Sequence, residues 1–234
     1  MKNVIAPVVF AATALAAGQA GAAPITACGP NVCYEYDNTQ AAAALTGLPT
    51  LVGDSMQFLA PAFAAQSQNG AGWVTVGGPS GYFIFDRVYT VNPGDEITTF
   101  TVAEEFDYEI ITDGEVRATL YTNALSNIVA TDTTSTTQNF IATGDTGGML
   151  IDSLAAMLYP ALQFSGPATD MAVGIQNTLR AFTDASGELA FIQKKFTLAT
   201  STIMNTTVVP VPAAIWLLGS GVLALGAVRR RRAG

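Results

Sequence analysis

The densest group of acidic side chains lies at residues 104–109, which read Glu-Glu-Phe-Asp-Tyr-Glu. On an extended strand Glu105, Asp107 and Glu109 share one face, about 6.5–7 Å apart. Like charges in such a row destabilise the strand unless a cation sits among them. Calcium prefers oxygen ligands and could bridge two of these carboxylates together with Asp113 or backbone carbonyls, so a calcium site is one interpretation of the pattern. The alternative is a solvated sheet face on which salt screens the acids.

Two of these acids also raise the question of hydrolysis. Glycosidases use paired carboxylates, and Glu105 and Asp107 on a flat strand fall within the range of separations that such pairs show. A productive pair also needs a cleft and one raised pKa, which the residue pattern does not indicate. The chain has no His, which excludes a His base and His-ligated metals. We therefore expect no enzyme, and a hydrolase of matrix polysaccharide acting through Glu105 and Asp107 is the alternative.

A second acidic motif, Asp145-Thr146-Gly147, matches the core of the aspartic-protease signature. That chemistry needs two carboxylates that share a proton, and the sequence contains no second copy of the motif. The surrounding residues 143–148 have ordinary turn composition, so we expect a loop.

Five aromatic residues lie in segments with strand character. They would form a sugar-stacking platform if several of them share an exposed face, whereas aromatic residues in strands more often belong to the core. These residues are Trp73, Tyr82, Tyr89, Tyr108 and Tyr121.

Two cysteines, Cys28 and Cys33, enclose the short turn Gly-Pro-Asn-Val. In an oxidising export compartment such a pair predicts a structural disulfide. A redox pair would be spaced as Cys-x-x-Cys, and a reactive thiol would have basic neighbours, which both cysteines lack.

The composition narrows the class of protein. The 234 residues include 10 Lys and Arg against 18 Asp and Glu, a net charge of −8, and only 12% of the residues are charged. An acidic surface argues against a nucleic-acid binder, because phosphate contacts need basic side chains. The length suits one domain plus end segments.

Short strand-like segments separated by turn residues recur along the middle of the chain, which predicts an all-β, antiparallel sandwich of jelly-roll type. Expected strands include 73–76, 82–91, 97–102 and 108–111, and Asp113-Gly114 predicts a tight hairpin to a returning strand. A turn at 184–187 predicts a second reversal between strands. Residues 149–158 have near-helical spacing of apolar residues, which fits a short helix as well as a strand.

The two ends look like targeting segments. Residues 1–22 contain one lysine, an apolar run and a small-x-small site, which predicts a cleaved signal peptide and a mature domain over 23–207. In 208–234, an uncharged stretch is followed by four arginines, which predicts a single transmembrane helix beginning near Ala213 with its C-terminus in the cytoplasm. Removing both ends leaves a net charge of about −13, which favours solubility.

The C-terminal segment resembles the PEP-CTERM sorting signal, in its Val-Pro-Leu-Pro-Ala variant. The motif residues are Val209, Pro210, Val211, Pro212, Ala213, Arg229, Arg230, Arg231 and Arg232. The resemblance implies processing by an exosortase in a Gram-negative bacterium that makes exopolysaccharide. Segments of the middle part, such as Gly53-Asp54-Ser55-Met56, are similar to the bodies of other PEP-CTERM proteins, which are generally β-rich and mostly without assigned activity.

We therefore expect an exported protein of the cell surface or extracellular matrix, held transiently in the inner membrane by its tail. Its expected partners are the exosortase-like enzyme, extracellular polysaccharide or matrix proteins, and the membrane, but not nucleic acid. Calcium is the one cofactor that the acidic strand suggests.

Overall fold

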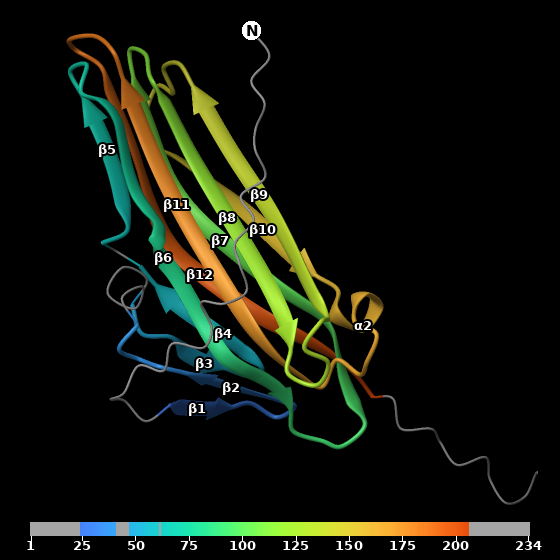
Figure 1. Cartoon of the computed structure of the whole chain (residues 1–234). Coiled ribbons are helices and arrows are strands. Elements are labelled where there is room, and N and C mark those ends of the chain that lie inside the picture. The colour runs from blue at the N-terminus through green and yellow to red at the C-terminus, as the bar shows by residue number, and fades with distance from the viewer. Residues whose placement is uncertain (1–23, 41–46, 61, 206–234) are drawn as a thin grey trace, which may run out of the picture.

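The computed structural model describes residues 24–40, 47–60 and 62–205. These residues form two antiparallel sheets that face each other (Figure 1), which confirms the expected all-β sandwich. The elements are β1 (Ile25–Cys28), β2 (Val32–Tyr36), β3 (Thr50–Val52), β4 (Ser55–Leu59), β5 (Ala64–Gln68), β6 (Gly72–Thr90), β7 (Asp95–Ile111), β8 (Glu115–Ser126), β9 (Thr133–Thr143), β10 (Leu150–Leu158), α2 (Pro160–Gln163), β11 (Asp170–Thr183) and β12 (Leu189–Asn205).

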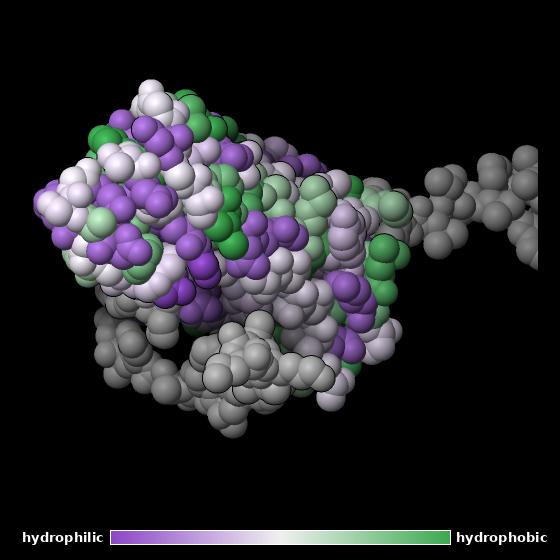
Figure 2. Space-filling model, turned by 90° about the horizontal axis from the view of Figure 1, so that it is seen from above, coloured by the Kyte–Doolittle hydropathy of each residue, from purple (hydrophilic) through white to green (hydrophobic). Residues whose placement is uncertain are grey.

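The first sheet has the strand order β1-β2-β6-β11-β8-β9. The second has the order β10-β7-β12-β4-β3, and β5 also pairs with β12. The long strands run along the molecule, while β1 to β4 gather at its lower end (Figure 1). At the upper end, where the chain turns between strands, hydrophilic and hydrophobic residues lie side by side (Figure 2).

Several strands are longer than their sequence patterns predict. The expected strands 73–76 and 82–91 are both parts of β6, and 97–102 and 108–111 are both parts of β7. At Gly77 and Gly78 the backbone has positive φ, 91° and 68°, and the pairing of β6 with β11 changes register there. The glycines therefore form a β-bulge inside a continuous strand, where the sequence suggested a strand end.

The expected hairpin at Asp113-Gly114 is wrong. The chain does reverse there, but β7 belongs to the second sheet and pairs with β12 and β10, whereas β8 belongs to the first. The turn at 184–187 likewise connects β11 to β12 across the sandwich. Turn residues determine that the chain reverses, but the burial of one face of each strand determines which sheet the next strand joins.

Residues 150–158 form the edge strand β10, not a helix, and a helical turn follows at α2. Leu154, Ala156 and Leu158 alternate toward the interior, while Met157 is exposed. The near-helical spacing arose because apolar residues on both faces of this strand were counted together.

The space between the sheets contains two apolar clusters. The lower cluster includes Phe83, Phe85 and Phe100, and the upper one includes Phe63 and Phe106. The predicted disulfide between Cys28 and Cys33 is confirmed and closes the β1–β2 hairpin at the edge of the first sheet.

Candidate functional site

The outer face of the first sheet carries a surface of aromatic, hydroxyl and amide side chains. Strict alternation along β8 buries every second residue and turns Arg117, Thr119, Tyr121 and Asn123 outward. Residues aligned with these on β6, β11 and β9 continue the surface in rows across the sheet. The rows are Thr75, Arg180, Arg117 and Ile141; Gly77, Thr178, Thr119 and Asn139; Tyr82, Gln176, Tyr121 and Thr137. We call this surface, including Trp73, the aromatic face.

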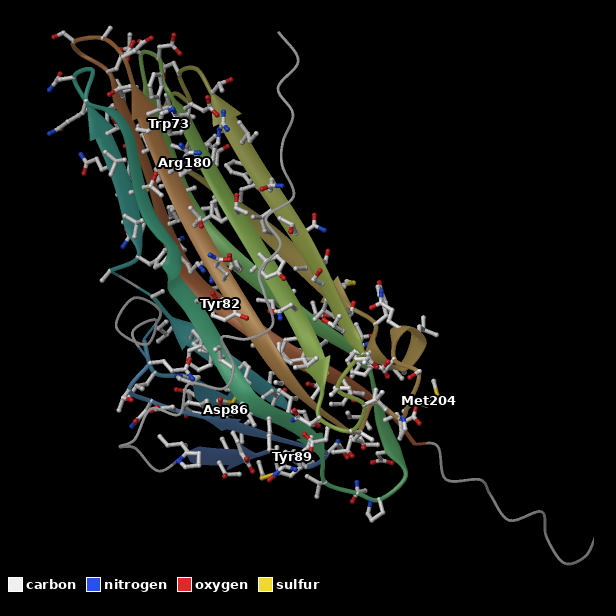
Figure 3. All side chains as sticks on the ribbon, viewed as in Figure 1. Trp73, Tyr82, Asp86, Tyr89, Arg180 and Met204 are labelled. Atoms are coloured by element: carbon white, nitrogen blue, oxygen red, sulfur yellow. A yellow bond between two sulfur atoms is a disulfide. The ribbon has the colours of Figure 1, made fainter. Side chains whose placement is uncertain are left out.

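Four of the five aromatic residues singled out from the sequence lie outside the core. Trp73, Tyr82 and Tyr89 are spaced along β6 (Figure 3), and Tyr121 lies on β8 in the same row as Tyr82. Tyr108 instead points inward from β7 and is 9% exposed, so for this residue the core alternative holds.

Tyr82 lies across the sheet over Gly174. Its hydroxyl donates to Asn123 Oδ1 on β8 at 2.9 Å, and a Cβ at position 174 would overlap both this hydroxyl and the Asn123 side chain. The absence of a side chain at Gly174 therefore creates the space in which the Tyr82 ring lies. Burial raises the pKa of Tyr82, so the phenol stays a neutral hydrogen-bond donor.

Trp73 forms the upper end of the aromatic face. The Arg180 and Arg117 guanidinium carbons lie 4.3 and 4.9 Å from its ring centre, and Phe182 packs against it at 5.0 Å. Such cation–π contacts hold the indole in a fixed orientation. Trp73 nevertheless remains 38% exposed, so part of its ring is available to a ligand.

The aromatic face is nearly free of acidic residues. Segments 73–84, 115–123, 135–143 and 174–182 contain one acid, Glu115, which is ion-paired with Arg117. Other acids of this acidic chain lie on the outer face of the second sheet. The aromatic face therefore differs sharply in charge from the outer face of the second sheet.

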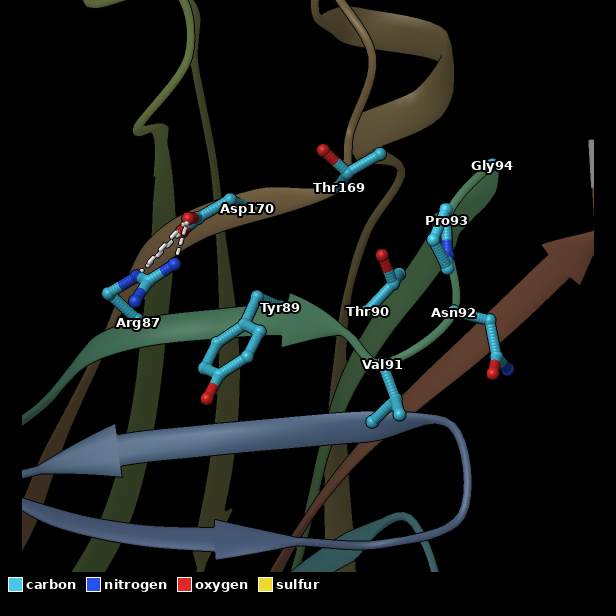
Figure 4. A pocket seen from close by; sticks show the side chains of 9 residues that line it. All are labelled: Arg87, Tyr89, Thr90, Val91, Asn92, Pro93, Gly94, Thr169 and Asp170. Carbon is cyan, nitrogen blue, oxygen red and sulfur yellow. Dashed lines mark hydrogen bonds and ion pairs between the residues drawn. The ribbon is translucent and has the colours of Figure 1, made fainter.

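A shallow pocket of about 320 Å³ opens near the lower end of the first sheet. Its walls include Arg87, Tyr89 and Asp170 (Figure 4), and the Arg87 guanidinium donates to Asp170 at 2.6 Å while lying 4.4 Å from the Tyr89 ring centre. A second acid, Glu35, contacts Arg87 at 3.4 Å. An aromatic ring beside fixed donors and acceptors suits a sugar, and the volume is at the small end of the range for ligand pockets.

The acids considered for calcium lie elsewhere. Glu105, Asp107 and Glu109 point outward from β7, as the alternation predicts. Lys195 on β12 lies 2.9 Å from Asp107 and 3.9 Å from Glu105, so a cation already neutralises part of the row. Within the described residues no three acids, cysteines or histidines converge as a metal site would require. Calcium binding by this strand stays a prediction.

The other acidic motif lies in a turn. Asp145 Oδ1 accepts a hydrogen bond from the Gly147 amide, and Thr146 Oγ1 bonds to Ile110 and Gly148, which fastens the β9–β10 loop to β7. This motif therefore has a structural role in the loop, as its turn composition predicted.

The signal peptide, its cleavage site and the sorting motif at 209–232 lie outside the described residues. Within the described part of the chain, no helix has the length and apolar character needed to span a bilayer.

Comparisons with known proteins yield no family. No protein-family model matches the chain, and no curated protein is significantly similar to it in sequence. Among solved structures, the arabinose-bound α-L-arabinofuranosidase MgGH51 aligns at 13% identity and TM-score 0.20, over 76% of this chain and 23% of the enzyme. The VP2 subviral particle of infectious bursal disease virus aligns at 13% identity and TM-score 0.19, over 88% of this chain and 55% of VP2. This chain thus spans at most about half of these proteins, and at such TM-scores they do not bear on its function.

Sequence reasoning missed two features of the structure. The arginines on both sides of Trp73 come from β8 and β11, which lie far from it in the sequence, and only the ladder register brings them together. The buried pair of Lys194 and Glu104 was also missed. The Lys194-Lys195 dipeptide in an otherwise uncharged strand was its one sequence signal, since two adjacent residues of a strand face opposite ways.

Proposed function

We propose that this protein is an exported, non-enzymatic component of an extracellular matrix that binds polysaccharide through the aromatic face of its first sheet. The observation that carries the proposal is the composition of this face: exposed or half-buried aromatic rings among hydroxyl and amide groups, with its one acid paired. Pyranose rings have apolar faces that stack on aromatic side chains, while their hydroxyls pair with the donors and acceptors between them.

The shape of the face favours a polymer over a small ligand. Tyr82 and Tyr121 lie in one row, Trp73 lies further up the sheet, and the pocket beside Tyr89 lies near its lower end. A chain of sugars running along β6 would meet Trp73, Tyr82 and the pocket beside Tyr89 in succession, with Tyr121 on β8 flanking it at the level of Tyr82. A small ligand would instead need a deep, mostly apolar cleft.

The strand order supports a jelly-roll sandwich. The four strands β5-β12-β7-β10 face β6-β11-β8-β9, and each connection but that between β8 and β9 crosses between the sheets. This is the arrangement of double-sheet jelly rolls, an architecture that includes lectin domains. Fold alone does not imply sugar binding, so the proposal depends on the residues of the face.

The proposed cellular location rests on the two ends of the chain. A signal peptide over 1–22 would direct export, and the PEP-CTERM-like segment 208–234, with its transmembrane helix, would hold the protein transiently in the inner membrane of a Gram-negative cell until an exosortase processes it. The disulfide between Cys28 and Cys33 supports an oxidising compartment.

No observation favours the hydrolase alternative. Glu105 and Asp107 lie on the second sheet, away from the pocket, and Lys195 contacts both. The pocket's own acid, Asp170, is bonded to Arg87.

The test is co-sedimentation of the protein, purified from producing cells, with the extracellular polysaccharide of the same cells. Trp73→Ala and Tyr121→Ala should each lower the affinity about tenfold, the equivalent of about 1.4 kcal/mol of stacking. Gly174→Ala should also weaken binding by displacing the Tyr82 ring.

Phe191→Ala is the matched control, because Phe191 is half-buried on the outer face of the second sheet. It should leave binding unchanged. Equal losses in all variants, or saturable binding that none of them weakens, would refute the aromatic face as the binding surface. Shortened polysaccharide would support the hydrolase, and loss of binding on calcium removal would point to the strand that carries Glu105 and Glu109.

A further inference from the structure

A polar layer separates the two apolar clusters in the middle of the sandwich. It contains Lys194 (1% exposed), Asn177 (2%), Glu104 (3%) and Thr197 (3%), which come from β12, β11 and β7. Polar groups are seldom buried this completely, and a buried lysine among aromatic rings is especially costly. The aromatic face includes none of these side chains.

A bulge in β12 turns Lys194 and Thr197 to the same side of the strand. Lys194 and Thr197 are three residues apart and would face opposite sides of a regular strand, but the pairing of β12 with β7 shifts register between Lys194 and Phe196. Asn177 lies at the shift between β11 and β6, opposite the bulge at Gly77. Bulges often re-aim side chains at functional sites, as the one in β12 does here, whereas Asn177 faces the interior by the regular alternation of β11.

Glu104 links two members of the layer, Lys194 and Thr197. Its Oε1 accepts a hydrogen bond from Lys194 Nζ at 2.7 Å and a second from Thr197 Oγ1 at 3.2 Å. Thr197 and Asn177 together line a cavity of about 10 Å³ between the sheets. The Asn177 Oδ1 atom is buried without a hydrogen-bond partner. A buried, unpaired amide in this position requires an explanation.

The surroundings favour the neutral form of the lysine. Burial lowers the pKa of Lys194, and the adjacent carboxylate of Glu104 opposes this effect. The Phe63 ring lies 5.0 Å from Nζ. A neutral, desolvated amine is a nucleophile, and the Glu104 carboxylate lies beside it as a proton acceptor.

We propose that Lys194 and Asn177 become joined by an intramolecular isopeptide bond, formed with the help of Glu104. In this reaction Lys194 Nζ attacks Asn177 Cγ, so that an Nζ–Cγ bond forms and the Cγ–Nδ2 bond breaks. Glu104 takes a proton from the attacking amine and returns it to the leaving nitrogen, which departs as ammonia. No oxidant or other reactant is needed, and the small cavity has room for a molecule of about this size.

The product would tie the two sheets together. Asn177 lies in the first sheet and Lys194 in the second, so the bond would cross the sandwich at the level where the polar layer interrupts the apolar core. It would also remove the cost of the buried amine. For a protein that works outside the cell, such a link would resist unfolding and proteolysis.

The test is peptide mass mapping of the full chain after reduction and trypsin digestion. Trypsin cuts after Arg117, Arg180 and Lys195, so the linked product joins residues 118–180 to 181–195. Its mass should be lower than that of the two peptides together by one ammonia, about 17 Da. Cleavage after Lys194, which needs a free amine, should be lost.

Glu104→Gln should abolish the linked product while leaving the β-sheet circular dichroism spectrum unchanged. Glu105→Gln, one residue along on the outer face, is the matched control and should keep it. A wild-type digest that contains the free peptide 181–194 and no linked product would overturn the proposal, whatever the variants do. A full yield of the link in Glu104→Gln would overturn the role of Glu104.

Discussion

At the scale of single residues, the acids of this protein differ in what their surroundings do to them. Asp132 fastens the loop after α2, because its carboxylate accepts hydrogen bonds from the Ser165 amide at 2.6 Å and the Gly166 amide at 3.2 Å. Asp86 is exposed and lies near two other acids, Asp37 and Glu35. The first environment favours the charged form and the second disfavours it.

We expect these two residues to change stability with opposite signs. Partial burial raises the pKa of Asp132, but the hydrogen bonds outweigh it and lower the pKa below its ordinary value of 3.8. Its stabilisation is therefore complete above that pH and is lost as the pH falls through the lower, folded-state pKa. Asp132→Asn should lower the melting temperature at pH 7 by a few degrees, and the difference from wild type should shrink toward pH 2, as measured by thermal denaturation.

Asp86→Asn is the control of opposite sign. Burial and the neighbouring acids raise the pKa of Asp86, so its charged form opposes folding once the pH exceeds 3.8. This variant should melt at or above the wild-type temperature at pH 7. A lower melting temperature for Asp86→Asn would contradict the assignment.

At the scale of elements, the strands differ in how many backbone hydrogen bonds and cross-links hold them in the sheet. Long strands such as β7 and β12 share an extended ladder, whereas β1 pairs only with β2 at the sheet edge. A three- or four-residue edge strand contributes little by itself. The disulfide between Cys28 and Cys33 compensates by closing this hairpin.

Removal of the disulfide should therefore have a modest effect. For so short a loop, chain entropy predicts a loss of about 2 kcal/mol from the free energy of unfolding of Cys28→Ser/Cys33→Ser. Urea denaturation followed by tryptophan fluorescence measures it. Reductant should lower the free energy of unfolding of the wild type by the same amount and leave that of the double variant unchanged. A double variant that does not fold would show that the hairpin contributes far more than this to stability.

At the scale of the whole molecule, the two outer faces have different chemistry. The second sheet presents acids such as Glu105 and Glu109, whereas the aromatic face presents rings, hydroxyls and amides. Its two arginines are engaged, Arg117 with Glu115 and both with Trp73. The molecule thus presents an acidic side that repels anionic polymers and a nearly neutral side suited to sugar rings.

Polysaccharide binding should accordingly depend little on salt. Between about 50 and 500 mM NaCl we expect the affinity to change less than about twofold, because screening acts on charge pairs and not on stacking. The co-sedimentation assay repeated across this range measures it. A steep decline with salt would show that the arginines bind an anionic polymer and would contradict a neutral contact surface.

Local patterns in the sequence account for the elements and their faces. The residue patterns of 97–102, 108–111 and 116–121 predict strands, and the side-chain period of two correctly places Glu105, Asp107 and Glu109 on one face of β7. The Cys28–Cys33 spacing predicts the disulfide for an equally local reason. The targeting segments predicted at both ends likewise rest on the sequence alone.

Only the tertiary structure decided which strands meet. Asp113-Gly114 predicts a reversal, but it takes burial of both sheets against each other to carry β8 across the sandwich. The aromatic face and the layer around Glu104 combine residues far apart in the chain, aligned by ladder registers and by a bulge in β12 that reverses side-chain direction. A period of two is a property of each strand by itself, whereas register and sheet membership depend on every partner at once, and no local pattern contains them.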